Sequence, residues 1–278
     1  MNRMRVISAF ICGIFVVLAP RAARLEEAPA RSAPTGDVTP VTPFDPTELA
    51  ESYFEQSERF DAFMTYEVKR GPAGALFSIA RRWRDGLAEL LFYVRAPESF
   101  EKWAMLMREN HGGSDDLFFY AGDATDRRVW RLASSHLERQ AIFELIALGD
   151  YRPTARGELS YEAGPDETLD SVACHMVVAR SPRPYLGFDK TELVFAAQER
   201  LLLQSRFFRG EKEVRRLSTT LADYQDIGGR KLATRWIAKR WADEGETEIV
   251  LRRVVETANL PDGLFSQLNL RIQHFPEF

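Results

Sequence analysis

The second half of the chain decides the fold, and it opens at residues 173–208 with ACHMVVARSPRPYLGFDKTELVFAAQERLLLQSRFF. This stretch holds three apolar-rich runs, Ala173–Ala179, Glu192–Ala196 and Leu201–Phe208, with turns between them. Three more runs follow, at Arg215–Leu221, Lys231–Lys239 and Thr247–Val255. Strands of this length between turn residues predict an antiparallel meander. Because no crossover helix fits between the runs, a parallel sheet is disfavoured.

The first half of the chain continues the pattern. Phe60–Lys69 alternates apolar and polar residues, broken only by Phe63, as a half-buried strand does. Further strands are expected at Ala75–Trp83, Leu87–Arg95, Phe100–Arg108, Leu117–Tyr120 and Arg127–Leu132. Together the two halves predict about eleven strands in one large, mainly β sheet.

Three segments are expected to depart from the strand pattern. Asp45–Arg59 begins with a capping Asp and a Pro in the first turn, which predicts a helix that packs on the sheet. Ala141–Leu148 is apolar at most positions and is expected to be a short helix or loop packed into the interior. Leu260–Phe265 predicts a short helical turn near the end of the sheet.

The N-terminus has the order of a secretory signal peptide. A basic region at Met1–Arg5 precedes the apolar run Val6–Ala19 and a small-residue segment, so residues 1–23 are expected to direct export. An uncleaved anchor is the alternative. Residues 24–44, rich in Pro, Ala, Thr and Ser, are expected to form a flexible leader, followed by one domain at residues 45–278.

Composition and motifs exclude several functions. The formal net charge is -4, with 37 basic and 41 acidic residues intermixed, so nucleic-acid binding is disfavoured. The four histidines have no partners at metal-ligand spacing, and no nucleophile motif is present. We therefore predict no enzyme activity, no metal and no cofactor. Cys174 lies inside an apolar strand and is expected to be a buried thiol.

Many aromatic, methionine and leucine side chains fall on the predicted strands. They are either ordinary core or the lining of a concave apolar surface that receives a lipid chain, for which each buried methylene contributes about 0.8 kcal/mol. The candidates for such a lining are Met64, Tyr66, Phe92, Trp103, Met105, Met107, Phe118, Tyr120, Phe143, Leu193, Phe195 and Leu203.

Four motifs resemble those of the outer-membrane lipoprotein-sorting protein family, which includes the LolA and LolB carriers. Leu260–Leu270, LPDGLFSQLNL, is similar to the family's closing LPDxLFTxxNL. Asp116–Tyr120 with Arg127–Leu132 resembles its WxYxP…RVRR strand pair, and Ser171–Val178 its GxxCYVxE strand. Phe188–Phe195, followed by Leu201–Leu203, resembles a weakened form of its WID…LPL hairpin.

The resemblance covers most of Asp61–Leu270 and implies an unclosed antiparallel β-barrel whose concave side is covered by helices. The covering pieces are expected to be Asp45–Arg59, Ala141–Leu148 and Pro261–Phe265. It also implies a periplasmic carrier for a lipid or lipoprotein acyl chain. Separately, we expect the protein to be a monomer. The alternative is an accessory subunit of an envelope transporter of the resistance-nodulation-division type, with an interior filled by its own side chains.

Overall fold

The computed structural model describes residues 43–100, 103–110, 115–122, 128–133, 140–141, 146–147, 151–181, 188–241, 245–257 and 260–272. All of them belong to one compact unit, Val38–Phe278. The expected signal at residues 1–23 and nearly all of the expected leader lie outside the described residues. None of the helices within these ranges is long and apolar enough to cross a membrane.

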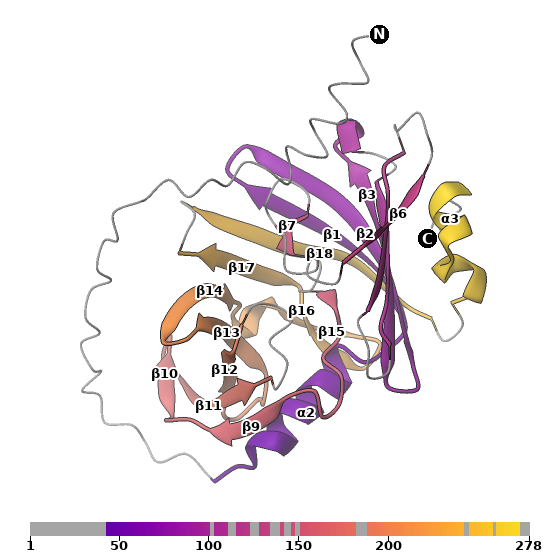
Figure 1. The fold of residues 1–278 in the computed structure, drawn as a ribbon. Helices are drawn as coiled ribbons and strands as arrows, with labels where there is room; N and C mark the ends of the chain where they lie inside the picture. The colour runs from indigo at the N-terminus through magenta and orange to yellow at the C-terminus, as the bar shows by residue number, and fades with distance from the viewer. Residues whose placement is uncertain are drawn as a thin grey trace. The chain divides into compact units, whose positions relative to one another are not determined.

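The strands of the main sheet come from two antiparallel meanders (Figure 1). The first consists of β1 (Ala62–Arg70), β2 (Ala73–Arg84), β3 (Leu87–Ala96), β4 (Ala104–Arg108), β5 (Asp116–Tyr120) and β6 (Val129–Leu132). The second consists of β9 (Ser160–Ala163), β10 (Glu167–Leu169), β11 (Val172–Arg180), β12 (Lys190–Ala196), β13 (Leu202–Arg209), β14 (Lys212–Ser218), β17 (Arg235–Arg240) and β18 (Glu246–Glu256).

Pairing between β1 and β18 joins the two meanders into one sheet. The strand order is β10-β11-β12-β13-β14-β17-β18-β1-β2-β3-β4-β5-β6, with β9 also paired to β11. The two ends of this order do not pair with each other, so the antiparallel sheet is open. The predicted mainly β, unclosed architecture is confirmed. The described part of the sheet has 14 strands, against about eleven expected, because short strands such as β9 and β10 were not recognised in the sequence.

Two segments differ from the sequence prediction. Within Ala141–Leu148, the described residues form no helix: β7 (Gln140–Ala141) pairs with β8 (Ile146–Ala147). The expected strand Lys231–Lys239 is split at Thr234, where the chain changes partner. Before Thr234, β16 (Arg230–Ala233) pairs with β15 (Tyr224–Ile227); after it, β17 enters the main sheet.

Helix α2 (Pro46–Ser57) covers the concave face of β11, β12 and β13, as predicted. The Asp45 carboxylate caps the helix by accepting hydrogen bonds from the backbone N–H groups of Thr47 at 2.8 Å and Glu48 at 3.1 Å. Its buried face packs against the sheet through Leu49, Ala50, Tyr53 and Phe54, which contact Val177, Leu193, Phe195 and Leu202. The spacing of its apolar residues therefore gives the helix one apolar face, and this face packs against the sheet.

The C-terminal segment covers the opposite face of the sheet. It comprises the 3-10 helix η5 (Asp262–Phe265) and helix α3 (Gln267–Ile272), which lies beside β4, β5 and β6 (Figure 1). Phe265 and Leu270 are fully buried in a cluster with Leu91, Leu106 and Phe118. Pro261–Phe265 does form the predicted helical turn, but the expectation that it covers the concave side is wrong.

Two further 3-10 turns, η1 (Glu98–Phe100) and η4 (Leu221–Asp223), connect strands.

This packing predicts that Phe265→Ala lowers the free energy of unfolding by about 3–5 kcal/mol, because it opens a cavity between the C-terminal segment and the sheet. Chemical denaturation followed by circular dichroism measures the change. The matched control is Leu268→Ala, since Leu268 lies in the same segment and is 61% exposed. The control should change stability by no more than about 0.5 kcal/mol. Equal effects of the two substitutions would contradict the described packing.

Candidate functional site

A cavity of about 290 Å³ lies on the concave side of the sheet, between the strands and α2. This volume is close to the lower end of the roughly 300–1,000 Å³ that is typical of ligand pockets. Apolar side chains from five strands dominate its wall: Leu193 on β12, Leu202 and Phe207 on β13, Leu217 on β14, Trp236 on β17 and Leu251 on β18. The site can therefore accept a hydrocarbon group without any directional contact.

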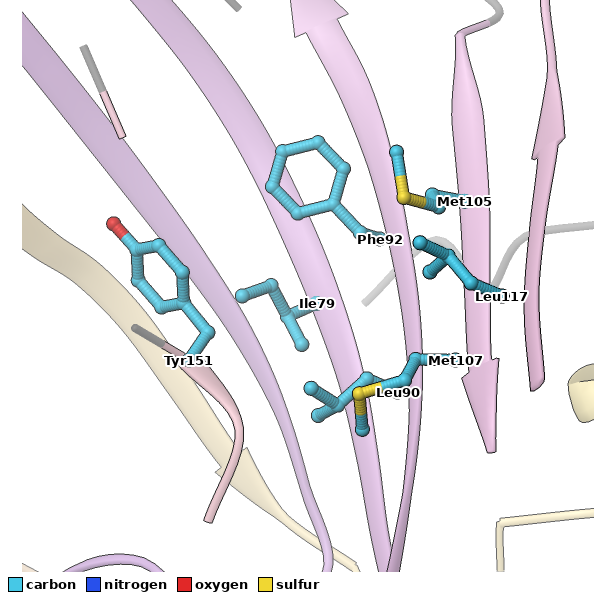
Figure 2. A pocket seen from close by; sticks show the side chains of 7 residues that line it. All are labelled: Ile79, Leu90, Phe92, Met105, Met107, Leu117 and Tyr151. Carbon is cyan, nitrogen blue, oxygen red and sulfur yellow. The ribbon is translucent and has the colours of Figure 1, made fainter. Parts of the chain in front are cut away.

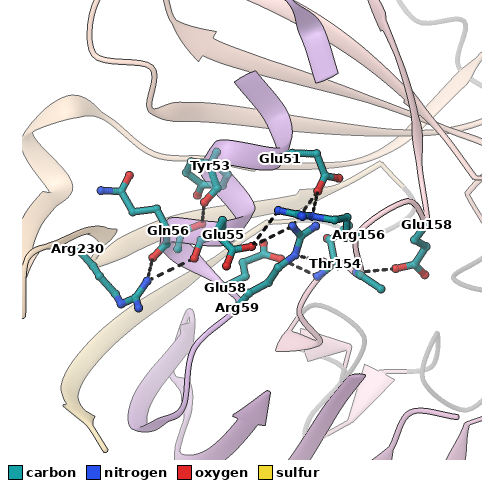
Figure 3. Close-up of polar contacts among 12 residues, drawn as sticks. Glu51, Tyr53, Glu55, Gln56, Glu58, Arg59, Thr154, Arg156, Glu158 and Arg230 are labelled. Atoms are coloured by element: carbon teal, nitrogen blue, oxygen red, sulfur yellow. Dashed lines mark hydrogen bonds and ion pairs between the residues drawn. The ribbon is translucent and has the colours of Figure 1, made fainter. Parts of the chain in front are cut away.

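Helix α2 and the segment at residues 151–159 cover the cavity, and polar contacts bind these two pieces together (Figure 3). The Arg59 guanidinium donates to the Thr154 carbonyl at 2.7 Å and to the Glu51 carboxylate at 2.8 Å. The backbone N–H of Thr154 donates in return to the Glu58 carboxylate at 2.8 Å. Arg152 anchors the same segment through ion pairs with Glu109 and, at 2.8 Å, Glu158.

Other contacts attach α2 to the two-stranded sheet of β15 and β16. Arg230 donates to the carbonyls of Gln56 at 3.0 Å and Glu55 at 3.3 Å near the end of the helix (Figure 3). The Tyr224 hydroxyl donates to the Leu202 carbonyl at 2.6 Å and lies 3.5 Å from the Tyr53 hydroxyl. Burial raises the pKa of Tyr53 to about 12, so this hydroxyl stays neutral at physiological pH.

Part of the cavity wall is polar or ionisable, and it includes Glu58, Tyr66 and Arg81. Burial raises the pKa of Glu58 and of Tyr66, and burial lowers the pKa of Arg81, because a low-dielectric wall disfavours each charged form. The Tyr66 hydroxyl donates to the Met64 sulfur at 3.3 Å. The wall of the cavity is thus mainly apolar and includes three buried ionisable side chains.

A second, much smaller space adjoins the first meander. Its volume is about 10 Å³, which is room for about one water molecule. Figure 2 shows the side chains that line it: Ile79, Leu90, Phe92, Met105, Met107, Leu117 and Tyr151. Tyr151 also lines the large cavity, so the two spaces are neighbours on one face. Side chains therefore fill nearly all of the space that these seven residues line.

The structure brings most of the sequence-predicted candidates to the concave face. Met64, Tyr66 and Leu193 line the large cavity, whereas Phe92, Met105 and Met107 line the small space. Trp103 packs in the same core cluster but lines neither. Phe195 is fully buried under Tyr53 of α2, with ring centroids 5.6 Å apart. Phe143 lies outside the described residues. A role in ligand binding stays a prediction for all of them.

Three candidates point to the opposite face, so the prediction that they line the concave surface is wrong. Phe118 and Tyr120 pack with the C-terminal segment, and Leu203 packs with Cys174 and Val194. The neighbouring residues Leu117 and Leu202 take the concave positions instead. Successive side chains in a strand alternate between faces, so the sequence prediction chose the wrong alternate set in β5 and β13.

The polar residues of the cavity were missed in the sequence, although one signal was present. Arg81 follows Phe77 and Ile79 at intervals of two in β2, and this spacing puts a charge on the apolar face of the strand. Glu58 and Thr154 carried no such signal, because they lie in irregular segments. Within the described ranges, no group of three or more His, Cys, Asp or Glu side chains could hold a metal ion. Cys174 is buried, as predicted.

The fold is similar to that of an outer membrane lipoprotein-sorting protein domain from Vibrio parahaemolyticus, with a TM-score of 0.70, 16% identity and coverage of 81% of this chain and 97% of that chain. A DUF1329 family protein from Desulfovibrio piger gives a TM-score of 0.68 at 16% identity, and the match covers 82% of this chain and 100% of that chain.

A LolA superfamily protein from Nitrosomonas europaea gives a TM-score of 0.62 at 16% identity, covering 81% of this chain and 99% of that chain. These identities show the fold alone, and at that level they confirm the predicted resemblance. No curated protein matches the chain. A family model described as "Uncharacterized protein" matches residues 86–272. The match spans more than half of the chain, and the chain belongs to that family.

The pKa of Glu58 predicts a pH-dependent effect of Glu58→Gln. Because the folded-state pKa is raised above the ordinary value of 4.5, the folded protein holds a proton that the unfolded chain has released, and stability falls as pH rises through this window. The variant retains an oxygen that can accept from Thr154 and has no charge to bury. It should be more stable than the unchanged protein above the folded-state pKa, and the gain should disappear below about pH 4.

Denaturation at a series of pH values measures this gain. Glu55→Gln is the control, since the Glu55 side chain lies three residues earlier and is 58% exposed, and this substitution changes the net charge by the same amount. A Glu58→Gln variant that is less stable than the unchanged protein at neutral pH would contradict the assignment of burial as the dominant effect on Glu58.

Proposed function

We propose that the protein is a non-catalytic periplasmic carrier that binds the acyl chain of a lipid or lipoprotein. The observation that carries this proposal is the covered, mainly apolar cavity of about 290 Å³ under α2. Each methylene group moved from water into such a site contributes about 0.8 kcal/mol. A long chain therefore binds tightly through burial alone, and one such cavity serves ligands that differ in their head groups.

Two further observations support the proposal. Residues 1–23 have the order of a signal peptide, which directs a protein out of the cytoplasm. The fold is shared with an outer membrane lipoprotein-sorting protein domain and with a LolA superfamily protein. In this reading the apolar side chains of β12–β18 hold the hydrocarbon, while α2 and residues 151–159 shield it from water.

A second candidate function is an accessory subunit of an envelope transporter of the resistance-nodulation-division type. The edges of the open sheet favour it: among the described residues β10 and β6 pair on one side only, and such strand edges are ready docking surfaces. The small space of about 10 Å³ beside the first meander also fits a protein without a ligand. The large cavity speaks against this candidate, since a purely structural domain gains nothing from leaving it open. Purification with a co-isolated transporter and no lipid would favour the accessory role.

Native mass spectrometry of the protein, gently purified from the periplasm, tests the carrier function directly. We expect bound lipid that is released on denaturation. The same preparation, stripped of lipid, should bind fluorescent fatty-acid probes with a stoichiometry near one. An apoprotein that carries no lipid and ignores such probes would overturn the proposal.

Substitutions at two adjacent residues, Leu251 and Arg252, test whether the ligand binds in this cavity. Leu251→Trp places a larger side chain into the cavity wall and should weaken probe binding at least tenfold by filling the space. Arg252→Trp is the matched control, because the Arg252 side chain is 51% exposed and does not line the cavity. Fluorescence titration compares the two, after circular dichroism has shown that both variants fold. Equal binding by Leu251→Trp and Arg252→Trp would exclude this cavity as the acyl site.

A further inference from the structure

Arg81 occupies an unusual position for a charged side chain. It lies on β2 in phase with Phe77 and Ile79, its side chain faces the concave side, and the residue is only 5% exposed. It forms part of the wall of the large cavity. A buried guanidinium is stable only when its charge and its N–H groups have partners.

The hydrogen bonds of Arg81 are few and long. Its Nε donates to the Phe60 carbonyl at 3.3 Å and its Nη2 to the Ser57 carbonyl at 3.5 Å, both beyond the usual range of about 2.7–3.2 Å. Its guanidinium carbon also lies 4.5 Å from the centre of the Phe60 ring. A guanidinium has five N–H donors, so three of them have no acceptor among the described residues.

Arg81 also lacks a carboxylate partner. No carboxylate oxygen lies within 4.0 Å of its nitrogens in the part of the chain that the structure describes. Other buried arginines differ: Arg59 pairs with Glu51, Arg82 with Glu89 and Arg206 with Glu167. The fold therefore supplies counterions to buried arginines elsewhere, and the arginine at the cavity is left to pair with something else.

The Glu58, Tyr66 and Asp61 side chains lie close enough to act electrostatically on Arg81, but none of them forms an ion pair with it. The Glu58 carboxylate lies beyond ion-pair distance and accepts a hydrogen bond from the Thr154 N–H at 2.8 Å. Burial favours the neutral form of Glu58 by raising its pKa. The Tyr66 hydroxyl is neutral and donates to Met64. Arg230 is a second cation that acts on Arg81, and it adds to the positive potential there.

We infer that Arg81 binds the anionic head group, a carboxylate or a phosphate, of an amphiphile whose hydrocarbon tail occupies the apolar part of the cavity. A guanidinium fork matches the oxygens of both groups and forms charge-assisted hydrogen bonds with them. The inference rests on the proposed acyl-chain function and narrows it. It assigns a negative charge to the ligand and sets the ligand's orientation, with the head group at Arg81 and the tail in the apolar part of the cavity.

The order of the strands sets that direction. Arg81 is on β2, and the apolar lining lies on strands that follow it in the order β2-β1-β18-β17-β14. Four strand spacings of about 4.8 Å place Leu217 on β14 roughly 19 Å from β2 along the sheet. An extended chain with its head group at Arg81 would thus pass Leu251 and Trp236 on its way to Leu217. The modest volume of about 290 Å³ fits one chain better than several.

The test compares three ligands with the same tail: hexadecanoate, hexadecyl phosphate and uncharged hexadecanol. Binding to the full delipidated protein is measured by calorimetry or by displacement of a fluorescent probe. We expect at least one of the two anions to bind at least tenfold more tightly than the alcohol. Arg81→Gln should abolish this preference and leave hexadecanol binding within about twofold of its original value. Arg180→Gln, at an exposed residue of β11, is the matched control and should retain the preference.

The alternatives give different results. Equal binding of all three ligands by the unchanged protein, or an equal loss of all three in Arg81→Gln, would overturn the role of Arg81 while leaving the acyl-chain function intact. Binding of none of them would overturn both. Saturable binding of inorganic phosphate alone, lost in Arg81→Gln, would replace the amphiphile with a free anion. If Arg81→Gln fails to fold, the preference of the unchanged protein and of Arg81→Lys still decides the question.

Discussion

The pairing of β1 with β18 is the contact on which the rest of the structure depends. Its register runs from Ala62 opposite Glu256 to Lys69 opposite Glu248, with one bulge, and it joins strands from the two ends of the domain. Without it, each meander would have an additional exposed edge and a concave face too narrow to enclose anything. The cavity needs both partners, since Met64 and Tyr66 come from β1 and Leu251 comes from β18.

Most of the strands could be predicted from the sequence, because alternation is a local property, but the pairing of β1 with β18 could not. The choice of face was predictable only where polar residues mark one side. In β1, Thr65 and Glu67 mark the face that Met64 and Tyr66 avoid. No such mark exists in residues 117–120, LFFY, or 201–203, LLL, because both faces of the sheet are covered there. Those were the places where the predicted lining failed.

Both faces are covered because the chain supplies a separate piece for each. The C-terminal segment seals the side of Phe118 and Leu106, while α2 and residues 151–159 seal the concave side. The sequence predicted the helical character of Asp45–Arg59 and Pro261–Phe265, but a helical turn with apolar residues fits either face equally well. Residues 151–159 had no periodicity at all. Their position depends on side-chain contacts, such as that of Arg59 with Thr154, between residues far apart in the chain.

The two halves of the concave face make the argument for a ligand. Over β2–β5, the space lined by Ile79, Leu90 and Phe92 has a volume of only about 10 Å³. Over β12–β18 the chain leaves about 290 Å³ open. The apolar side chains along this space stay in contact with water unless something else covers them, and this contact is unfavourable. Larger side chains at Ala179 or Ala233 would reduce the open space, yet both positions in the wall have alanine. A buried arginine in the wall without a carboxylate partner adds a second unfavourable contribution. Both contributions are removed together by one molecule that has a hydrocarbon tail and a negative charge at its end.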